Sequence, residues 1–167
     1  DVINNCDSLV WLDGNTYYTS NNIPQIVYYN FENYNADDDI STGTDYYSYG
    51  NGSTMNASVD SGQGAFWSNG FAVMDTSGFG VINWDIDVIN GEVYEFKSYI
   101  KPGSFNAASL SLRINKGGND VVITNHPGGN EWEKVIINWT ADTTGQVAFR
   151  AVKTWGVASF DEIEINL

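Results

Sequence analysis

The sequence predicts an all-β protein, an antiparallel β-sandwich of the jelly-roll type. Composition is the first reason: the 167 residues include fourteen Val, fourteen Ile and ten Tyr but only five Leu, and seventeen glycines supply turns. Spacing is the second reason, because short segments of alternating apolar and polar residues follow one another with turn signals between them. The apolar fraction of 42% can form a core, and the length suits one domain.

The N-terminal segment is expected to differ from the rest of the chain. Residues 1–25 are predicted to be a linker-like extension, and residues 26–167 the β-sandwich domain. Whether the extension packs on the domain is left open. The segment CDSLVWLDGNTYYTSNN, which begins at Cys6, resembles linkers in secreted, multi-modular surface proteins of marine bacteria. This resemblance implies a secreted, extracellular protein that is part of a larger polypeptide.

The strands are predicted from the alternation along the domain. A first strand is expected at 26–31, followed by an acidic loop at 35–39 and a long loop with strand fragments at 41–56. A short strand is expected at 65–66 and clearer ones at 80–88, 93–101, 109–115, 121–125, 132–140, 146–154 and 159–166. Turns are predicted at Asn90-Gly91 and Gly117-Gly118, among others.

Charge is distributed unevenly along the chain. The formal net charge is −14 and the pI is near 4.1, which argues against non-specific binding to nucleic acids or to anionic membranes. Residues 1–96 contain fourteen acidic and no basic residues, whereas residues 97–167 contain seven of each. The single cysteine excludes an intramolecular disulfide, and its redox state is left open.

Three basic residues are predicted on solvent-facing strand positions. The alternation places Lys97, Arg113 and Arg150 outward on their strands. If these strands belong to one sheet, their outer face is a cationic patch on an acidic protein. The alternative is that each charge only keeps its strand face soluble.

Several motifs resemble carbohydrate-binding modules of the family 4, 9, 16 and 22 jelly-roll group. These are Tyr29-Asn-Phe-Glu32 at the end of the first strand, the strand that begins Gly91-Glu-Val-Tyr94, Glu131-Trp132 before a later strand, and the closing Ser159-Phe-Asp-Glu-Ile163. The resemblance covers residues 26–167. It implies a non-catalytic module that binds a polysaccharide or oligosaccharide while a catalytic domain of the same polypeptide, such as a glycoside hydrolase, cuts it.

The candidate carbohydrate-binding residues combine rings with charges. Trp67 and Trp155 lie among small or polar residues, so they are expected to be exposed and to stack on sugars. The full expected set is Trp67, Lys97, Tyr99, Arg113, Arg150, Lys153 and Trp155. Three loop tyrosines, Tyr46, Tyr47 and Tyr49, are second-rank candidates. Trp84, Trp132 and Trp139 are expected in the core.

The resemblance also implies a structural calcium ion. Glu32 and Asp161 match the positions at which the group places calcium, and Asp60 is a further candidate ligand. Calcium takes six to eight oxygen ligands, so loop carbonyls or further carboxylates would have to complete the shell.

The leading functional hypothesis is a monomeric, non-catalytic module that targets an appended enzyme to a marine polysaccharide, preferentially a sulfated galactan such as carrageenan. Guanidinium groups bind sulfate in the way they bind other oxyanions, which is the reason for this preference. A module for neutral β-glucan or mannan and an adhesin or interaction domain of a surface protein are the alternatives. Catalysis is disfavoured because the only histidine, His126, has no nucleophile motif near it and the carboxylate pairs lie on single strands.

Overall fold

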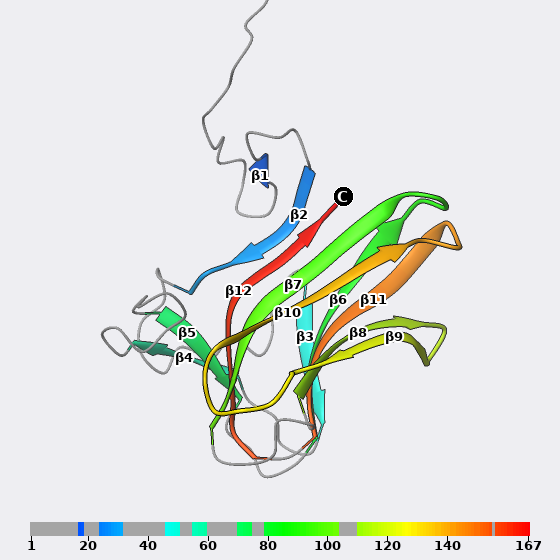
Figure 1. Cartoon of the computed structure of the whole chain (residues 1–167). Coiled ribbons are helices and arrows are strands. Elements are labelled where there is room, and N and C mark those ends of the chain that lie inside the picture. The colour runs from blue at the N-terminus through cyan, green and yellow to red at the C-terminus, as the bar shows by residue number, and fades with distance from the viewer. Residues whose placement is uncertain are drawn as a thin grey trace, which may run out of the picture.

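The computed structural model shows two antiparallel β-sheets packed face to face as a sandwich (Figure 1). It describes residues 17–18, 24–31, 46–50, 55–59, 70–74, 79–103, 110–154 and 156–167. Every regular element in these ranges is a strand. None of the described residues forms a helix long and apolar enough to cross a membrane. The all-β sandwich predicted from the sequence is therefore confirmed.

The larger sheet has seven strands. They are β1 (Tyr17–Tyr18), β2 (Pro24–Tyr29), β4 (Met55–Val59), β5 (Gly70–Met74), β7 (Val93–Pro102), β10 (Glu133–Thr140) and β12 (Ala158–Asn166). Strand β12 lies at its centre and pairs with β7 along one edge. Along its other edge, the first half of β12 pairs with β5 and the second half with β2.

The second sheet has five strands in the order β3-β6-β11-β8-β9. Their bounds are β3 (Tyr46–Gly50), β6 (Gly80–Val88), β8 (Leu110–Lys116), β9 (Asn119–Asn125) and β11 (Gly145–Lys153). In Figure 1 β8, β9 and β11 lie to the right of β12 and below β10, as part of a separate layer.

The strands predicted from residue 80 onward agree with β6 to β12, mostly to within one or two residues. The middle of the chain differs, because β3, β4 and β5 occupy much of a region for which only loops and strand fragments were expected. Strand β1 lies within the predicted extension and pairs with β2, so the extension contributes one short strand to the sheet.

Aromatic rings fill the space between the sheets. Phe149 of β11 is completely buried and lies 5.7 Å from Phe96, 6.1 Å from Tyr94 and 6.3 Å from Trp139, measured between ring centroids. These three partners belong to the opposite sheet. Trp84 of β6 also crosses the interface, 6.0 Å from Phe96. Edge-to-face rings at such separations stabilise a core beyond the area that they bury.

Trp84 and Trp139 therefore lie in the core as predicted. The prediction is wrong for Trp132, which precedes β10 and is only half-buried. Its position number has the opposite parity from the buried Val135, Ile137 and Trp139, so it does not continue their inward series.

The first prediction concerns this aromatic contact between the sheets. We expect Phe149→Ala to lower the free energy of unfolding by about 3–5 kcal/mol, because it removes a large buried ring and leaves a cavity. Ile123→Ala on β9, where the side chain is 49% exposed, should cost less than about 1 kcal/mol. Urea denaturation followed by tryptophan fluorescence measures both. Equal losses in the two variants would show that Phe149 does not hold the sheets together.

Candidate functional site

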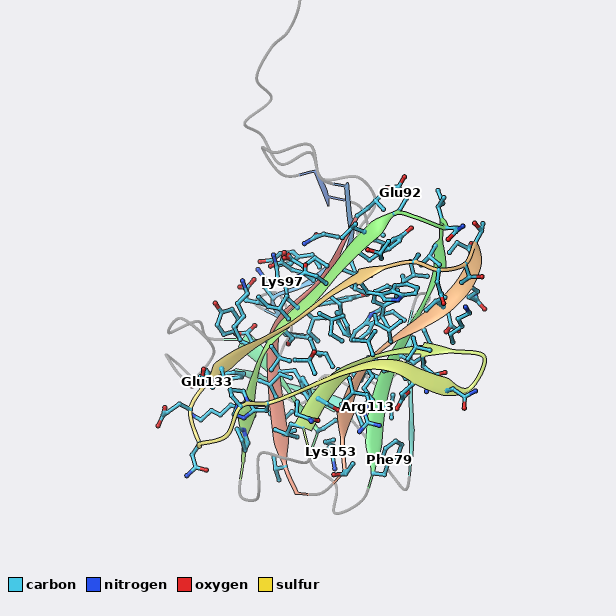
Figure 2. The ribbon with its side chains drawn as sticks, turned by 45° about the vertical axis from the view of Figure 1, so that its right-hand side comes forward. Phe79, Glu92, Lys97, Arg113, Glu133 and Lys153 are labelled. Atoms are coloured by element: carbon cyan, nitrogen blue, oxygen red, sulfur yellow. The ribbon has the colours of Figure 1, made fainter. Side chains whose placement is uncertain are left out.

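The residues expected to form one cationic face are divided between the two sheets. Lys97 and Tyr99 lie on β7, whereas Arg113 lies on β8 and Arg150 on β11 of the other sheet. Figure 2 shows Lys97 and Arg113 on different sheets of the sandwich. The condition for a single continuous face, that all these strands belong to one sheet, is not met. Alternation distinguishes outward from inward positions but does not show which sheet a strand joins.

Lys153 does not belong to an exposed patch. It is completely buried at the end of β11. Its position has the same parity as the inward-facing Val147, Phe149 and Ala151, whereas Arg150 has the opposite parity and is partly exposed. The expectation that Lys153 contacts a sugar on the surface is therefore wrong.

Two arginines meet on the outer face of the five-stranded sheet. Arg113 and Arg150 are direct partners in the β8–β11 register. Like charges in opposing positions destabilise a sheet, and Asp120 of β9 relieves this repulsion. Its Oδ2 lies 2.8 Å from Nη1 of Arg113, and its Oδ1 lies 3.7 Å from Nη1 of Arg150.

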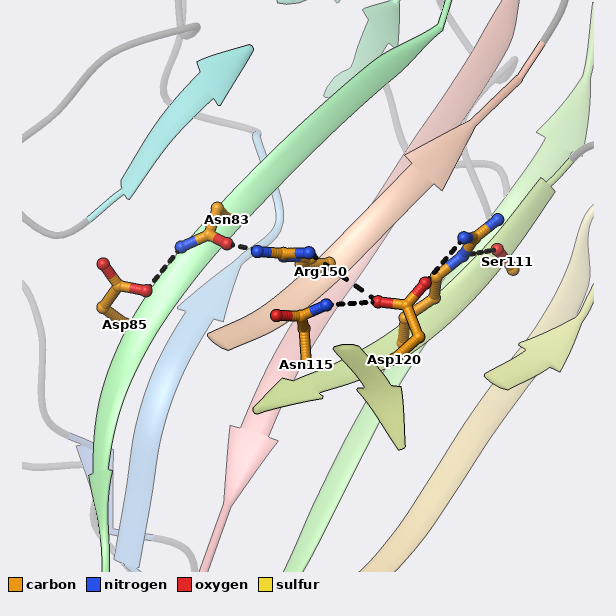
Figure 3. A network of polar contacts seen from close by, with 7 residues as sticks. Asn83, Asp85, Ser111, Asn115, Asp120 and Arg150 are labelled. Atoms are coloured by element: carbon orange, nitrogen blue, oxygen red, sulfur yellow. Dashed lines mark hydrogen bonds and ion pairs between the residues drawn. The ribbon is translucent and has the colours of Figure 1, made fainter. Parts of the chain in front are cut away.

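Amide and hydroxyl side chains extend this network on both sides (Figure 3). Asn115 Nδ2 donates to Oδ1 of Asp120 at 2.7 Å, and Nε of Arg113 donates to Oγ of Ser111 at 2.9 Å. On β6, Asn83 accepts from Nε of Arg150 at 2.9 Å and donates to Oδ1 of Asp85 at 2.7 Å. We call this set the polar platform: Asn83, Asp85, Ser111, Arg113, Asn115, Asp120 and Arg150.

A β-bulge places Asp120 within reach of both arginines. The β8–β9 register shifts by one residue between Ile114 and Asn115, so that Asn115 pairs with Asp120. The hairpin before it turns at Gly117 and Gly118, whose φ angles of +59° and +90° favour glycine. Bulges commonly redirect side chains in this way. The platform was missed in the sequence because such a shift breaks the simple alternation.

The charges of the polar platform are nearly balanced. Burial opposes ionisation of Asp120, but hydrogen bonds from Asn115 and Arg113 and the charges of both arginines outweigh it. The pKa of Asp120 is therefore held below its ordinary value of 3.8. The face combines the guanidinium groups of Arg113 and Arg150 with three carboxylates. These belong to Asp120 and to the exposed Asp85 and Asp87 of β6. Asn83, Ser111 and Asn115 are buried beneath this face, whereas Arg113, Asp120 and Arg150 are partly exposed, so the face is not a cationic patch.

Strand β3 is the edge strand beside β6. The backbone register pairs Tyr47, one of the second-rank tyrosines, with Asn83 of the platform, so β3 borders the platform in the sheet. Trp67 and Trp155 lie outside the described residues, and their stacking role stays a prediction.

His126 is committed to backbone contacts. The buried ring accepts from the N–H of Gly128 through Nδ1 at 3.1 Å, and Nε2 lies 3.1 Å from the carbonyl oxygen of Ile100. The ring thus has the tautomer that donates from Nε2. This arrangement holds the loop after β9 against β7 and gives His126 a structural role.

Asp161 is the only expected calcium ligand among the described residues. It is completely buried where the partner of β12 changes from β5 to β2, and its Oδ1 accepts from the N–H of Glu162 at 2.8 Å. Strand β2, which precedes Glu32 in the chain, pairs with the second half of β12. Glu32 and Asp60 lie outside the described residues, within which no group of three or more metal-ligating side chains occurs. A buried carboxylate fits a hard cation, so Asp161 suits calcium as one oxygen donor.

No family model and no curated protein matches the sequence, but solved structures are similar to it. The CBM22-1–GH10 modules of endo-1,4-β-D-xylanase 10B from Clostridium thermocellum, complexed with xylohexaose, match 85% of this chain at 11% identity and a TM-score of 0.60, and this chain covers 28% of theirs. TmCBM61 in complex with β-1,4-galactotriose matches 82% of this chain at 14% identity with a TM-score of 0.54, and 97% of the TmCBM61 chain is covered. The K1 cleaved adhesin domain of Lys-gingipain from Porphyromonas gingivalis matches 83% of this chain at 15% identity with a TM-score of 0.53, and 96% of the adhesin chain is covered. At such low identity the similarity establishes the fold, which this chain shares with carbohydrate-binding modules.

The second prediction tests the charge balance of the polar platform. Asp120→Asn should destabilise the protein by about 1 kcal/mol near neutral pH, because it leaves two opposing arginines without their shared carboxylate. The folded-state pKa of Asp120 is lowered, so its contribution is present above the ordinary value of 3.8 and is lost as the pH falls through the lowered pKa. The wild type and the variant should therefore converge in acid. Urea denaturation from about pH 7 to about pH 3 measures the difference. A gap that stays constant over this range would contradict the assigned role.

Proposed function

We propose that this domain is a non-catalytic carbohydrate-binding module that holds a polysaccharide chain on the polar platform. The carrying observation is the network centred on Asp120, in which the partly exposed donors of Arg113 and Arg150 lie beside the partly exposed carboxylate on an outer sheet face, and buried amides hold them in place. A sugar hydroxyl can both donate and accept hydrogen bonds, and a surface that offers both is complementary to it. Because the side chains already hold one another in place, little rotamer entropy is lost when the sugar binds.

The charge balance favours a neutral chain over a sulfated one. Arg113 and Arg150 share Asp120, and the carboxylates of Asp85 and Asp87 lie on the same face. A sulfated galactan such as carrageenan would have to compete with Asp120 for the guanidinium groups and would approach two further carboxylates. The xylanase modules and TmCBM61 are described with neutral oligosaccharides, which agrees with this preference. A neutral β-glycan is thus the proposed ligand, and a sulfated galactan is the alternative.

The molecular setting is part of the same proposal. In the xylanase structure a carbohydrate-binding module and a catalytic module belong to one protein. We therefore place this monomeric domain in a secreted enzyme, where it keeps an appended catalytic domain on its polysaccharide. Trp67 and Trp155 are proposed to stack on sugar rings. The Lys-gingipain likeness supports a second candidate, an adhesin domain that binds another protein.

The third prediction is made for affinity electrophoresis in gels that contain xylan, β-1,4-galactan, laminarin, mannan, alginate or carrageenan. At least one neutral polymer should retard the wild type, and raising the ionic strength should leave this retardation nearly unchanged because no net charge drives it. Arg150→Ala should weaken binding by about 1.5–3 kcal/mol, since it removes charged hydrogen-bond donors.

Lys116→Ala is the matched control for Arg150→Ala. Lys116 is the last residue of β8, and its Nζ pairs with Asp142 at 2.9 Å and not with a platform residue. The variant therefore loses one positive charge without loss of a platform donor. Retardation by carrageenan alone, abolished by salt, would replace the neutral ligand with the sulfated one. Retardation by none of the polymers would favour the adhesin.

The fourth prediction concerns the proposed calcium ion. If Asp161 binds calcium together with Glu32 and Asp60, a chelator should lower the melting temperature of the wild type, and added calcium should restore it. Glu32→Ala should melt at the same temperature with and without chelator. Differential scanning calorimetry measures both, and a wild-type melt that does not respond to chelator would reject the ion.

A further inference from the structure

The outer face of the larger sheet contains a second candidate site, on the opposite side of the sandwich from the polar platform. A cavity of about 220 Å³ opens there, over β7, β10 and β12. We call it the bulge cavity and define it by its lining residues, Lys97, Ser98, Tyr99, Lys134, Glu162 and Glu164.

A bulge in β12 shapes this cavity. The β7–β12 register shifts by one residue between Asp161 and Glu164, which leaves an extra residue opposite Ser98. Within the bulge Glu162 has a φ of +49°, a left-handed conformation that is uncommon for any residue other than glycine. Tyr28 of β2 donates from its hydroxyl to Oε2 of Glu162 at 2.7 Å. Strained residues that surrounding contacts hold in place are concentrated at binding sites.

Lys97 is held firmly inside the cavity wall. Its Nζ lies 2.9 Å from Oε1 of Glu95 and 2.9 Å from Oε2 of Glu164, and its side chain is 19% exposed. Burial opposes its charge, but the two carboxylates outweigh burial and raise the pKa of Lys97. An ammonium group has three N–H donors, and these two carboxylates account for two of them.

Lys134 completes the donor set from the neighbouring strand. It pairs with Tyr99 in the β7–β10 register, is exposed, and has no ion-pair partner among the described residues. The cavity lining therefore contains two ammonium groups, two carboxylates and one tyrosine ring, and its formal charge is zero.

We propose that the bulge cavity binds a single neutral sugar unit, independently of the polar platform. Ammonium donors and carboxylate acceptors around one small space match the vicinal hydroxyls of a pyranose, and the Tyr99 ring offers an apolar surface to its C–H face. The volume lies below the roughly 300 Å³ at which sites for larger ligands begin, so the cavity suits one ring and not a chain.

The balanced charge selects against ionic ligands. A sulfate or carboxylate attracted by Lys134 would be repelled by Glu162 and Glu164, and an amine attracted by these glutamates would be repelled by both lysines. A neutral sugar meets neither penalty. Such a unit can come from free monosaccharide or from the end of a polysaccharide chain.

The fifth prediction is tested by titrating the isotope-labelled full chain and recording amide NMR shifts. The probes are the methyl glycosides of glucose, galactose, mannose and xylose, with galactose 6-sulfate and glucosamine as charged comparisons. At least one neutral glycoside should produce saturable shifts at residues 97–99, 134 and 162–164, and should bind more tightly than either charged probe. Lys134→Ala and Tyr99→Ala should each weaken this binding by at least about tenfold.

Two controls separate this site from the proposed function. Lys116→Ala removes a charge elsewhere, and Arg150→Ala impairs the polar platform on the other sheet, so both should leave the cavity shifts unchanged. Lys134 is exposed, so its alanine variant keeps the fold even if Tyr99→Ala does not. Shifts with short oligosaccharides of the bound glycoside would identify a chain end as the source, and shifts with the monosaccharide alone would identify free sugar. The proposal fails if no neutral glycoside saturates the cavity, if a charged probe binds more tightly, or if Lys134→Ala binds as well as wild type.

Discussion

The aromatic contact between the two sheets is the constraint on which the rest of the molecule depends. Phe149 from one sheet contacts Phe96, Tyr94 and Trp139 from the other. Trp84, from the same sheet as Phe149, also contacts Phe96. All of these rings are buried. A ring that must point inward determines the facing of every second residue on its strand. Because Phe149 points inward, Arg150 points outward, and because Phe96 points inward, Lys97 points outward. The two candidate binding surfaces are thus the outer sides of strands whose inner sides form the core.

The two surfaces use charge in a similar way. On the polar platform Asp120 is shared by two arginines, and in the bulge cavity Lys97 is shared by two glutamates. In both cases one charged group holds two of opposite sign, so that the side chains are ordered and the local field is small. Such surfaces distinguish ligands by the geometry of their hydrogen bonds and not by long-range attraction, which suits a protein of strongly acidic overall charge.

Local patterns in the sequence predict most of the strands, because alternation depends only on neighbouring residues. The facing of Arg113, Arg150 and Lys97 was predicted correctly for the same reason. Their grouping was not, because the pairing of β8 with β11 and of β7 with β12 joins residues far apart in the chain. Asp120 and Glu162 were missed as site residues because both depend on bulges, at which alternation breaks down. Lys153 shows that a charged residue can follow the inward series.

The bulge in β12 also lengthens this strand by one residue relative to β7. Before it the inward-facing residues have even numbers, Ala158 and Phe160, and after it they have odd numbers, Ile163 and Ile165. Loss of the extra residue would remove the bulge and restore simple alternation, with Ile163 and Ile165 still facing inward, but it would also remove the left-handed backbone at Glu162. The core on either side of the bulge therefore does not need the extra residue, and a strand shortened by one would keep its packing while it lost the wall of the bulge cavity.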